Sequence, residues 1–261
     1  MKLLCLGSGT SHGVPVIGCD CAVCRSGDPR NRRTRASVLL RNGRATLLID
    51  TPPDFREQML RHGIRSVDAI LFTHAHADHI FGLDDVRILC NWRKAPMPVY
   101  GRPDTLDQLR RKFDYVFETK DFTRRWDIPR LTLHPLDGAA RISGVGVTPV
   151  PIRHGCALIL GYRVGGLAYL TDCSAVPDEA MSLLRGLDTL VIGAIRHEPH
   201  PTHFSLREAL DLVECLAPRR AFNTHISHRL EHAQTEANLP PRVRLAYDGL
   251  EVEFPAPEDE G

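Results

Sequence analysis

The stretch 73–79, with the sequence THAHADH, limits what this chain can be more than any other segment. It follows a short, continuous apolar run over 67–72 that is flanked by charge, which predicts a buried strand. Apolar residues then recur at helical spacing, so we expect a helix to begin near His79. This order would bring four metal-binding side chains to one strand end: His74, His76, Asp78 and His79. Three imidazoles and a carboxylate suit Zn²⁺ or Mn²⁺ and exceed what one mononuclear catalytic site needs, so the loop predicts two metal ions.

Other ligand-type residues also follow apolar runs. Three of them stand at or just after the end of such a run: His154, Asp172 and His225. Asp50 ends another run, where its carboxylate could either orient a metal-bound histidine or cap the helix that follows. A single histidine is usually a core or surface residue, but four residues of metal-ligand type within the six positions 74–79 make that interpretation improbable here.

Three cysteines are bunched near the start of the chain, at Cys19, Cys21 and Cys24. Thiolates this close suit Zn²⁺, because soft sulfur ligands satisfy a tetrahedral structural site. Only three thiols are local, so a fourth ligand must come from elsewhere; buried free cysteines are the alternative. The chain has eight cysteines, but this bunching suits a metal better than a disulfide framework. We expect the remaining ones to be buried core thiols: Cys5, Cys90, Cys156, Cys173 and Cys215.

Length and charge narrow the class of protein. At 261 residues the chain can bury a sizeable core, as one large domain or two small ones. Its net charge of +1 gives no general reason to expect a nucleic-acid or acidic-membrane partner. The start is apolar over too short a run for a signal peptide, and no run reaches the length of a membrane-spanning helix. We therefore expect a cytoplasmic protein without a membrane partner.

Apolar runs and turn residues predict a strand-rich chain. We expect strands over 2–6, 37–40, 45–49, 67–72, 97–100, 131–133, 145–149, 158–164, 167–170, 189–192, 243–247 and 251–254. Glycine-containing pairs predict hairpins at 42–43, 165–166 and 248–249. We expect helices over 55–62, 105–117, 180–187 and 205–216, the last with Ser205 as its N-cap. Strands outnumber helices in both halves, so we predict an α+β fold, a four-layer α/β/β/α sandwich, as one domain over 1–261.

Two loops near the start of the chain allow more than one interpretation. The glycines of segment 7–15 permit a close backbone approach to a ligand, but the segment lacks a P-loop ending and can be a plain connection. Segment 25–35 holds five arginines. It is either a solvated surface or a region that attracts an anionic substrate or partner.

Together these features resemble the metallo-β-lactamase superfamily, and within it the PhnP-type phosphodiesterases of phosphonate degradation. The matching features are the GSGT and GVP segments within 7–15, the cysteine cluster, the THAHADH loop, the Thr-Asp pair at 171–172 and the THISH segment at 224–228. They extend from residue 7 to Gly249, which is nearly the whole chain. The HxHxDH motif identifies only the superfamily, whereas the cysteine cluster combined with His-x-x-His is far more specific.

The resemblance implies a ligand set. One metal ion would be held by His74, His76 and His154, and a second by Asp78, His79 and His225, with Asp172 bridging the two. The resemblance also supplies His228 as the fourth ligand of a structural Zn²⁺ bound to the three clustered cysteines. The two catalytic ions would be Mn²⁺ or Zn²⁺. Among His197, His200 and His203, it favours His203 as the group that hydrogen-bonds the phosphate or protonates the leaving oxygen, a surface histidine being the alternative.

The implied activity is hydrolysis of a small cyclic phosphodiester, either 5-phosphoribosyl 1,2-cyclic phosphate or a 2′,3′-cyclic nucleotide, by hydroxide held between two metals. One alternative is a tRNA 3′-processing endonuclease, although no basic glycine-rich insertion resembles its tRNA-binding arm. Another is a non-catalytic, zinc-stabilised binding module, which the intact ligand set disfavours because unpaired polar groups are costly to bury. We expect catalytic roles for His203, Asp78 and Asp172 and a small phosphodiester as partner, with no nucleic acid and a homodimer left open.

Overall fold

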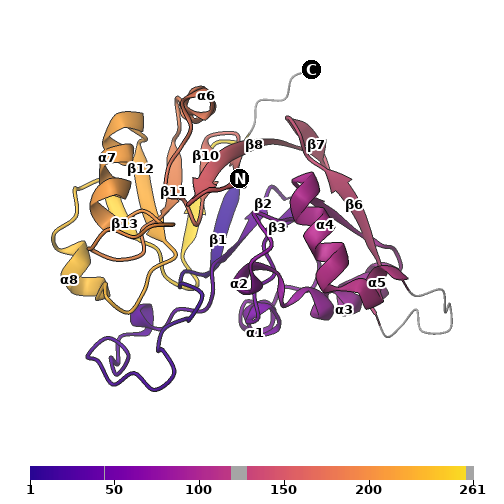
Figure 1. Cartoon of the computed structure of the whole chain (residues 1–261), viewed down its shortest axis with the longest axis horizontal. Helices are drawn as coiled ribbons and strands as arrows, with labels where there is room; N and C mark the ends of the chain where they lie inside the picture. The colour runs from indigo at the N-terminus through magenta and orange to yellow at the C-terminus, as the bar shows by residue number, and fades with distance from the viewer. Residues whose placement is uncertain (44, 119–127, 257–261) are drawn as a thin grey trace.

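Two seven-stranded sheets organise the chain. The structure, a computed structural model, describes residues 1–43, 45–118 and 128–256. The strand order is β14-β1-β2-β3-β4-β5-β6 in the first sheet and β13-β12-β11-β10-β9-β8-β7 in the second. The first half of the chain and the second half lie side by side, with β1 between them (Figure 1).

The strand bounds follow the apolar runs. The first sheet consists of β1 (Lys2–Gly7), β2 (Ser37–Arg41), β3 (Thr46–Ile49), β4 (Ala69–Leu71), β5 (Met97–Gly101), β6 (Leu131–Pro135) and β14 (Glu251–Glu253). The second consists of β7 (Ala140–Ile142), β8 (Val145–His154), β9 (Ala157–Val164), β10 (Leu167–Leu170), β11 (Thr189–Gly193), β12 (Arg220–Thr224) and β13 (Val243–Leu245). The sequence did not predict β7, and β8 is five residues longer than the predicted strand over 145–149.

Alternation along β1 explains how the layers stack. Leu3 and Cys5 belong to the apolar core between the two sheets, together with Tyr162 and Tyr169 of the second sheet. Leu4 points to the opposite face, into a second core that includes residues of the helices. Because successive side chains of a strand point to opposite faces, one strand contributes to both cores.

Helices cover the outer face of each sheet. Over the first sheet lie α1 (Phe55–Arg61), α3 (Val86–Arg93) and α4 (Pro103–Lys112); over the second lie α6 (Asp178–Met181) and α7 (Leu206–Leu216). Ser205 caps α7 as predicted: its hydroxyl accepts from the Glu208 amide, and the Glu208 carboxylate accepts from the Ser205 amide. The predicted four-layer α/β/β/α sandwich is therefore confirmed.

The helix expected from His79 onward is interrupted. A short helix, α2 (Ala77–Ile80), begins two residues earlier, and a 3₁₀ turn, η2 (Leu83–Asp85), separates it from α3. At Gly82 the backbone passes so close to the Pro52 carbonyl that a Cβ atom would lie 2.2 Å from its oxygen. The Gly82 amide donates to the Thr51 carbonyl at 2.9 Å and not to a carbonyl one turn earlier, so the apolar residues at helical spacing do not form one helix here.

Two other predicted helices are also shorter or divided. The helix predicted over 105–117 consists of α4 and a second helix, α5 (Asp114–Glu118), which separate at Phe113. The helix predicted over 180–187 consists of α6 and a 3₁₀ turn, η4 (Ser182–Leu184). The helix α8 (His232–Glu236) was not predicted. None of the helices in the described ranges has the length and apolar character needed to cross a bilayer.

Two of the three predicted hairpins are confirmed, and the third is wrong. β2 pairs with β3, and β9 pairs with β10, both antiparallel. β13 instead pairs in parallel with β12, while β14 pairs antiparallel with β1 in the other sheet. The Asp-Gly turn at 248–249 therefore carries the chain from one sheet to the other. The cause is burial: Val252 and Phe254 of this terminal segment belong to the core between the sheets.

Some of the predicted core thiols are buried and others are exposed. Cys5, Cys90 and Cys173 are buried as expected. Cys156 and Cys215 are exposed, so their assignment to the core was wrong. Cys156 lies in the turn between β8 and β9, and Cys215 lies on α7 facing away from the second sheet.

Candidate metal centre

The predicted ligands converge because the strands that carry them end at neighbouring positions. β3 and β4 run in parallel, as do β10, β11 and β12, and the carboxyl ends of parallel strands meet at one edge of a sheet. The THAHADH loop follows β4, Asp172 follows β10 and His225 follows β12. His154 is the last residue of β8.

One group of ligand atoms comes from His74, His76 and His154, whose ligand-type nitrogens lie within 4.8 Å of one another. His74 Nε2 is 2.9 Å from His76 Nδ1. His154 Nδ1 lies 2.9 Å from the Asp172 carbonyl oxygen and 2.8 Å from that of Thr202, so it donates and leaves Nε2 as the ligand atom.

A second group comes from Asp78, His79, Asp172 and His225, again within 4.8 Å. Asp172 Oδ1 is 3.1 Å from His79 Nε2 and 3.3 Å from His225 Nδ1, and Asp78 Oδ2 is 3.4 Å from His79 Nε2. Separations of about 3–3.5 Å are those expected between ligand atoms that share a cation at bond lengths of about 2.0–2.2 Å. Asp172 also groups with His154 of the first set and with His203, which suits a residue placed between two ions.

The chemistry of these donors fits divalent cations. His79 Nε2 and His225 Nδ1 are buried and have no hydrogen-bond partner among the described residues. Such unpartnered polar atoms are costly inside a protein unless something else binds them. Burial lowers the pKa of His225, which favours the neutral imidazole that a metal requires. Burial opposes the charge of Asp172, but nearby His225 and His79 hold the pKa of its carboxyl well below the usual range, which keeps it ionised.

Asp50 orients one of these ligands. Its carboxylate accepts from His79 Nδ1 at 2.7 Å, from the Thr73 amide at 2.9 Å and from the Thr73 hydroxyl at 2.8 Å. The bond to His79 fixes the tautomer that directs Nε2 toward Asp172. Of the two roles that the sequence left open for Asp50, the structure supports the orienting one, because its carboxylate contacts His79 and not the first turn of α1.

Backbone strain is concentrated at this site. Asp50, Asp172 and His225 have positive φ angles of 64°, 54° and 56°. Residues other than glycine rarely adopt this region, at a cost of order 1–3 kcal/mol each, and persist there only where surrounding contacts hold them. The contacts of these three residues are therefore part of how the site is built.

The sequence did not assign roles to Thr73 and Thr171, two of the three threonines that directly precede candidate ligands. Thr73 bonds to Asp50, and the Thr171 hydroxyl donates to Asp172 Oδ1 at 2.7 Å. Both threonines are fully buried at the point where a strand gives way to a loop. The signal that could have revealed them is this repeated placement of a hydroxyl immediately before a ligand at a strand end.

His203 lies beside the site and not within either of the main groups. Its Nδ1 is 3.7 Å from Asp172 Oδ2, and its ring lies 4.9 Å from the ring of His225 and 5.0 Å from that of His200. Burial, followed by the nearby His225, lowers the pKa of His203 to about 3. His203 Nδ1 also has no hydrogen-bond partner among the described residues.

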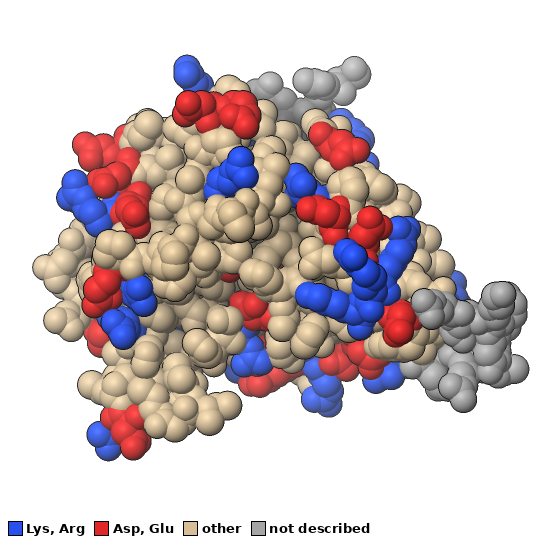
Figure 2. All heavy atoms as spheres, in the orientation of Figure 1, with Lys and Arg blue, Asp and Glu red and all other residues tan. Residues whose placement is uncertain are grey.

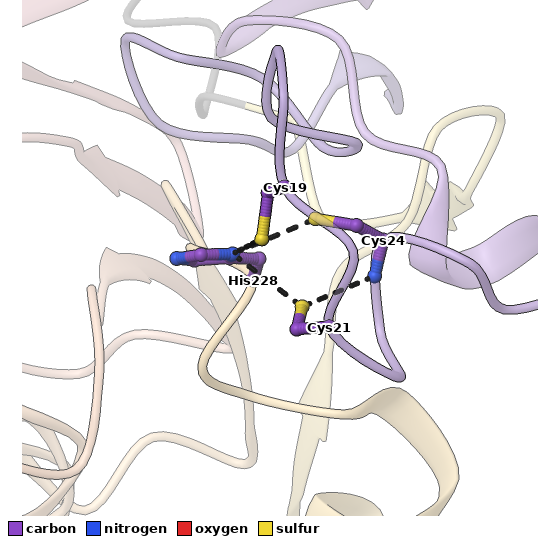
Figure 3. Close-up of side chains that lie close together, drawn as sticks. All are labelled: Cys19, Cys21, Cys24 and His228. Atoms are coloured by element: carbon purple, nitrogen blue, oxygen red, sulfur yellow. Dashed lines mark hydrogen bonds between the residues drawn. The ribbon is translucent and has the colours of Figure 1, made fainter.

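A separate cluster contains the three bunched cysteines and His228 (Figure 3). His228 Nδ1 is 3.2 Å from Cys19 Sγ, 3.6 Å from Cys21 Sγ and 3.5 Å from Cys24 Sγ. A tetrahedral zinc with Zn–S and Zn–N bonds of about 2.3 and 2.0 Å requires sulfur–nitrogen separations of about 3.5 Å. A hydrogen bond from the Cys24 amide lowers the pKa of Cys21 to about 6, whereas burial raises the pKa of Cys24 to about 11, so the match to zinc rests on the distances. The cluster therefore fits a structural Zn²⁺.

The basic loop is largely engaged within the chain. Arg30 pairs with Asp28 at 2.7 Å, and Arg35 pairs with Asp54 at 2.9 Å. Arg33 is 2% exposed and donates to the carbonyls of Ser227 and Leu230, both at 3.0 Å. These contacts weaken the interpretation of segment 25–35 as a binding site for a substrate phosphate.

Comparison with known proteins agrees with this arrangement. Residues 45–226, more than half of the chain, match the β-lactamase superfamily domain. A solved structure of a new diphosphatase from the PhnP family is 47% identical, covers 98% of each chain and superposes with a TM-score of 0.91. An octanoyltransferase from Porphyromonas gingivalis is 38% identical over 97% of this chain, which spans only 51% of that relative's length.

A Zn²⁺-bound PqqB from Methylobacterium extorquens shares the fold, with 23% identity and a TM-score of 0.73 over 97% of this chain and 100% of that chain. The sequence match over most of the chain and the full-length structural match point to the same group of proteins. This chain belongs to the metallo-β-lactamase superfamily and, within it, to the PhnP family.

Proposed function

We propose that this hydrolase is a dinuclear, metal-dependent phosphoric diester hydrolase that opens a small cyclic phosphodiester, of the 5-phosphoribosyl 1,2-cyclic phosphate or 2′,3′-cyclic nucleotide type. The observation that carries the proposal is the sharing of Asp172. Its carboxylate belongs to the group with Asp78, His79 and His225 and also lies within 4.8 Å of the His154 ligand atom, so two cations held by the two groups would be adjacent. Two adjacent cations are typical of enzymes that catalyse in-line displacement at phosphorus.

The chain's own residues would divide the work of holding the metals. His74, His76 and His154 would bind one ion, and Asp78, His79 and His225 the other, with Asp172 between them. When bound, the ions would neutralise charge on the phosphoryl oxygens and acidify a water molecule. Asp50 would hold the His79 ring, and Thr171 would hold the Asp172 carboxylate.

His203 is suited to contact the substrate. Its side chain is 12% exposed and borders Asp172, and its Nδ1 has no hydrogen-bond partner within the described part of the chain. A neutral imidazole there can donate a hydrogen bond to a phosphoryl oxygen or to the leaving oxygen. We assign it this role because it lies beside the ligand groups without belonging to the two that would hold the ions.

A diphosphate linkage is a second candidate substrate. The PhnP-family relative with 47% identity is a diphosphatase. A diphosphate and a cyclic phosphodiester both require cleavage of a phosphorus–oxygen bond beside negative charge, so one pair of cations could serve either reaction. The two candidates differ in the leaving group, which is a phosphate in one case and an alkoxide in the other.

Processing of tRNA receives less support. Binding of RNA requires lysines and arginines that neutralise phosphates. The arginines that are best placed, in segment 25–35, mostly bond to acidic side chains or backbone carbonyls of this chain. On the face that Figure 2 shows, blue and red side chains are interspersed and do not form one continuous basic surface. We therefore prefer a small substrate.

The decisive experiment compares substrates on purified protein loaded with Mn²⁺ or Zn²⁺. The panel contains bis-p-nitrophenyl phosphate, 2′,3′-cyclic AMP, 5-phosphoribosyl 1,2-cyclic phosphate, a dinucleoside diphosphate and a precursor tRNA. We expect turnover of at least one cyclic phosphodiester, with kcat/KM at least tenfold above that for the diphosphate. Faster turnover of the diphosphate would favour the second candidate, and salt-dependent tRNA cleavage would favour the nuclease.

The control is Asp211→Ala, which removes an exposed carboxylate of α7 far from the ligand groups. It should behave as the wild type does with every substrate. No turnover of any member of the panel by protein that holds both catalytic ions would contradict the hydrolase proposal and favour a non-catalytic binding module.

A further inference from the structure

A buried carboxylate, Asp248, lies at the crossing between the two sheets. Its side chain is 4% exposed and accepts four hydrogen bonds. Oδ1 accepts from the amide and hydroxyl of Ser8 at 2.9 and 2.8 Å, and Oδ2 accepts from the amide and hydroxyl of Thr34 at 2.8 and 2.6 Å. Arg61 of α1 adds an ion pair at 3.5 Å. Asp248 therefore joins the terminal turn to the glycine-rich loop 7–10 and to the segment before β2.

The glycine-rich loop in turn supports a metal-ligand candidate. The Ser8 carbonyl accepts from the amide of Ile226 at 2.8 Å, and Gly9 forms a parallel β-bridge with Ile226. A Cβ at Gly9 would lie 2.8 Å from the Arg33 carbonyl, so only glycine allows the loop to lie this close. The loop is therefore packed between Asp248 on one side and the residue after His225 on the other.

His225 needs such support. Its φ of 56° is a conformation that residues other than glycine adopt only when neighbouring contacts impose it. The Ile226 amide, one peptide away, is fixed by Ser8. This series of hydrogen bonds, from Asp248 through Ser8 to Ile226, thus connects a carboxylate near the end of the sequence to the backbone that orients the His225 ring.

We propose that Asp248 is a positioning residue for the metal centre, holding His225 in its ligating orientation through Ser8 and Ile226. In this role Asp248 links the GSGT loop and the Asp-Gly turn at 248–249 to the metal centre, and the proposed function gives neither segment a part. It rests on the proposed function only in taking His225 as a metal ligand, and it requires no particular substrate.

The test is Asp248→Asn, which conserves shape but replaces one acceptor oxygen with an amide that donates. Each carboxylate oxygen of Asp248 accepts from one backbone amide and one hydroxyl. The side-chain NH₂ of asparagine would therefore face a backbone N–H, which is also a donor and cannot rotate to become an acceptor. We expect the ion held by Asp78, His79 and His225 to bind about 10–100-fold more weakly, as for loss of other residues that orient ligands. Competition titration with a chelator, followed by metal analysis at each step, would measure this.

The matched control is Asp188→Asn. Asp188 is also a hydrogen-bonded carboxylate, paired with Arg219 and Arg220, but it precedes β11, at the opposite end of that strand from the metal centre. It should leave the affinity of both catalytic ions unchanged. Equal weakening of all ions in Asp248→Asn, in proportion to loss of folded protein, would show that the residue only stabilises the fold and would overturn the proposal.

Ser8→Ala offers a second test that is milder for folding, since it removes one hydroxyl and keeps the backbone bonds. We expect the affinity for the same single ion to fall by a smaller factor than in Asp248→Asn, while the circular dichroism spectrum stays unchanged. Unchanged affinity in both Ser8→Ala and Asp248→Asn would also overturn the proposal. Because these measurements count metal ions and not turnover, absence of phosphodiesterase activity in the wild type would refute the proposed function and leave this inference standing.

Discussion

The molecule contains two clusters of metal-ligand type, and they are built in opposite ways. The His/Asp groups stand at strand ends, and most of their members are buried. Some members are oriented by hydrogen bonds: His79 donates to Asp50, His154 donates to a backbone carbonyl, and Asp172 accepts from Thr171. The cysteine cluster stands on a loop without strands, and three of its four members are partly exposed. The segment after the cysteines contacts the start of α8, because the Asn31 side-chain amide donates to the carboxylate of Glu231, the N-cap of α8, at 2.6 Å.

This difference is the one expected if the His/Asp groups form the proposed catalytic site and the cysteine cluster fastens a loop. Structural zinc sites are closed by four protein ligands, whereas catalytic sites keep a position open for water or substrate. Cys19, Cys21, Cys24 and His228 offer four ligand atoms within 4.8 Å of one another, the number that a closed tetrahedral site requires. The two clusters are nevertheless connected, because His225 and His228 lie three residues apart on one segment. A tether formed at the cysteine cluster would therefore limit the movement of a catalytic ligand.

The largest effect should come from Asp172→Ala, which removes a carboxylate of one His/Asp group that also lies within 4.8 Å of the His154 ligand atom of the other group. We expect turnover to fall below detection and the catalytic metal content to fall with it. This loss should exceed the roughly 10–100-fold cost of removing a residue that only orients a ligand. Steady-state kinetics and metal analysis would measure both. Full activity in this variant would exclude Asp172 as the bridging residue, while Zn²⁺ at the cysteine cluster should remain.

The positions of the ligands could be predicted because they depend on local sequence. A strand end is recognisable from the apolar run before it, and residues that follow parallel strands meet at one edge. The loop at 73–79, Asp172 and His225 all satisfy this condition. The four layers were predicted from two strand-rich halves with helices between groups of strands; β1 itself is buried on both faces, because it contributes to a core on each side.

The errors arose where a distant contact overrides a local signal. The Asp-Gly pair at 248–249 is a turn, but Val252 pairs with Leu3, far away in the sequence, and not with the neighbouring strand. The helical pattern is interrupted at Gly82, whose amide donates to the Thr51 carbonyl, about thirty residues earlier. Arg33 belongs to a charged segment and yet is buried among carbonyl oxygens. No property of these residues alone reveals the partner that decides their structure.

The second prediction concerns His203, which borders the His/Asp groups without joining the two that would hold the ions. His203→Ala should lower kcat by about 10²–10⁴-fold, the usual contribution of a group that donates to the substrate in the transition state. Both catalytic ions should remain bound. His134→Ala, at an exposed histidine that stacks on Tyr100, is the control and should change nothing. Loss of a metal ion from His203→Ala would reassign His203 as a ligand.

The third prediction tests how much the orienting bonds contribute. Asp50→Asn retains the shape of the side chain but removes the charge that His79 Nδ1 contacts at 2.7 Å. We expect turnover and the affinity of one catalytic ion to fall about 10–100-fold. The comparison between the clusters predicts selectivity: zinc at the cysteine cluster should be unaffected. Equal loss of zinc there would show that Asp50 acts on the fold as a whole.

The smallest effect on turnover should come from Cys21→Ser, because this variant alters the fastening of the loop and leaves every catalytic ligand in place. Its hydroxyl cannot replace a thiolate whose pKa is near 6, so the cluster should lose its Zn²⁺. We expect Tm to fall by several degrees, since 1 kcal/mol corresponds to about 2–4 °C for domains of 150–250 residues. Cys215→Ser, at an exposed cysteine of α7, should leave both Tm and zinc content unchanged.

The activity that remains in Cys21→Ser then shows how strongly loss of metal at the cysteine cluster affects the His/Asp groups. Since His228 is only three residues from His225, release of the loop should weaken the nearby catalytic ion slightly, and excess metal should restore turnover to within a few-fold of wild type. Loss of turnover with the full zinc content would contradict a structural site, because the thiol would then act in the reaction itself. Restoration by added metal would instead show that the two clusters differ in task and share only the segment that joins them.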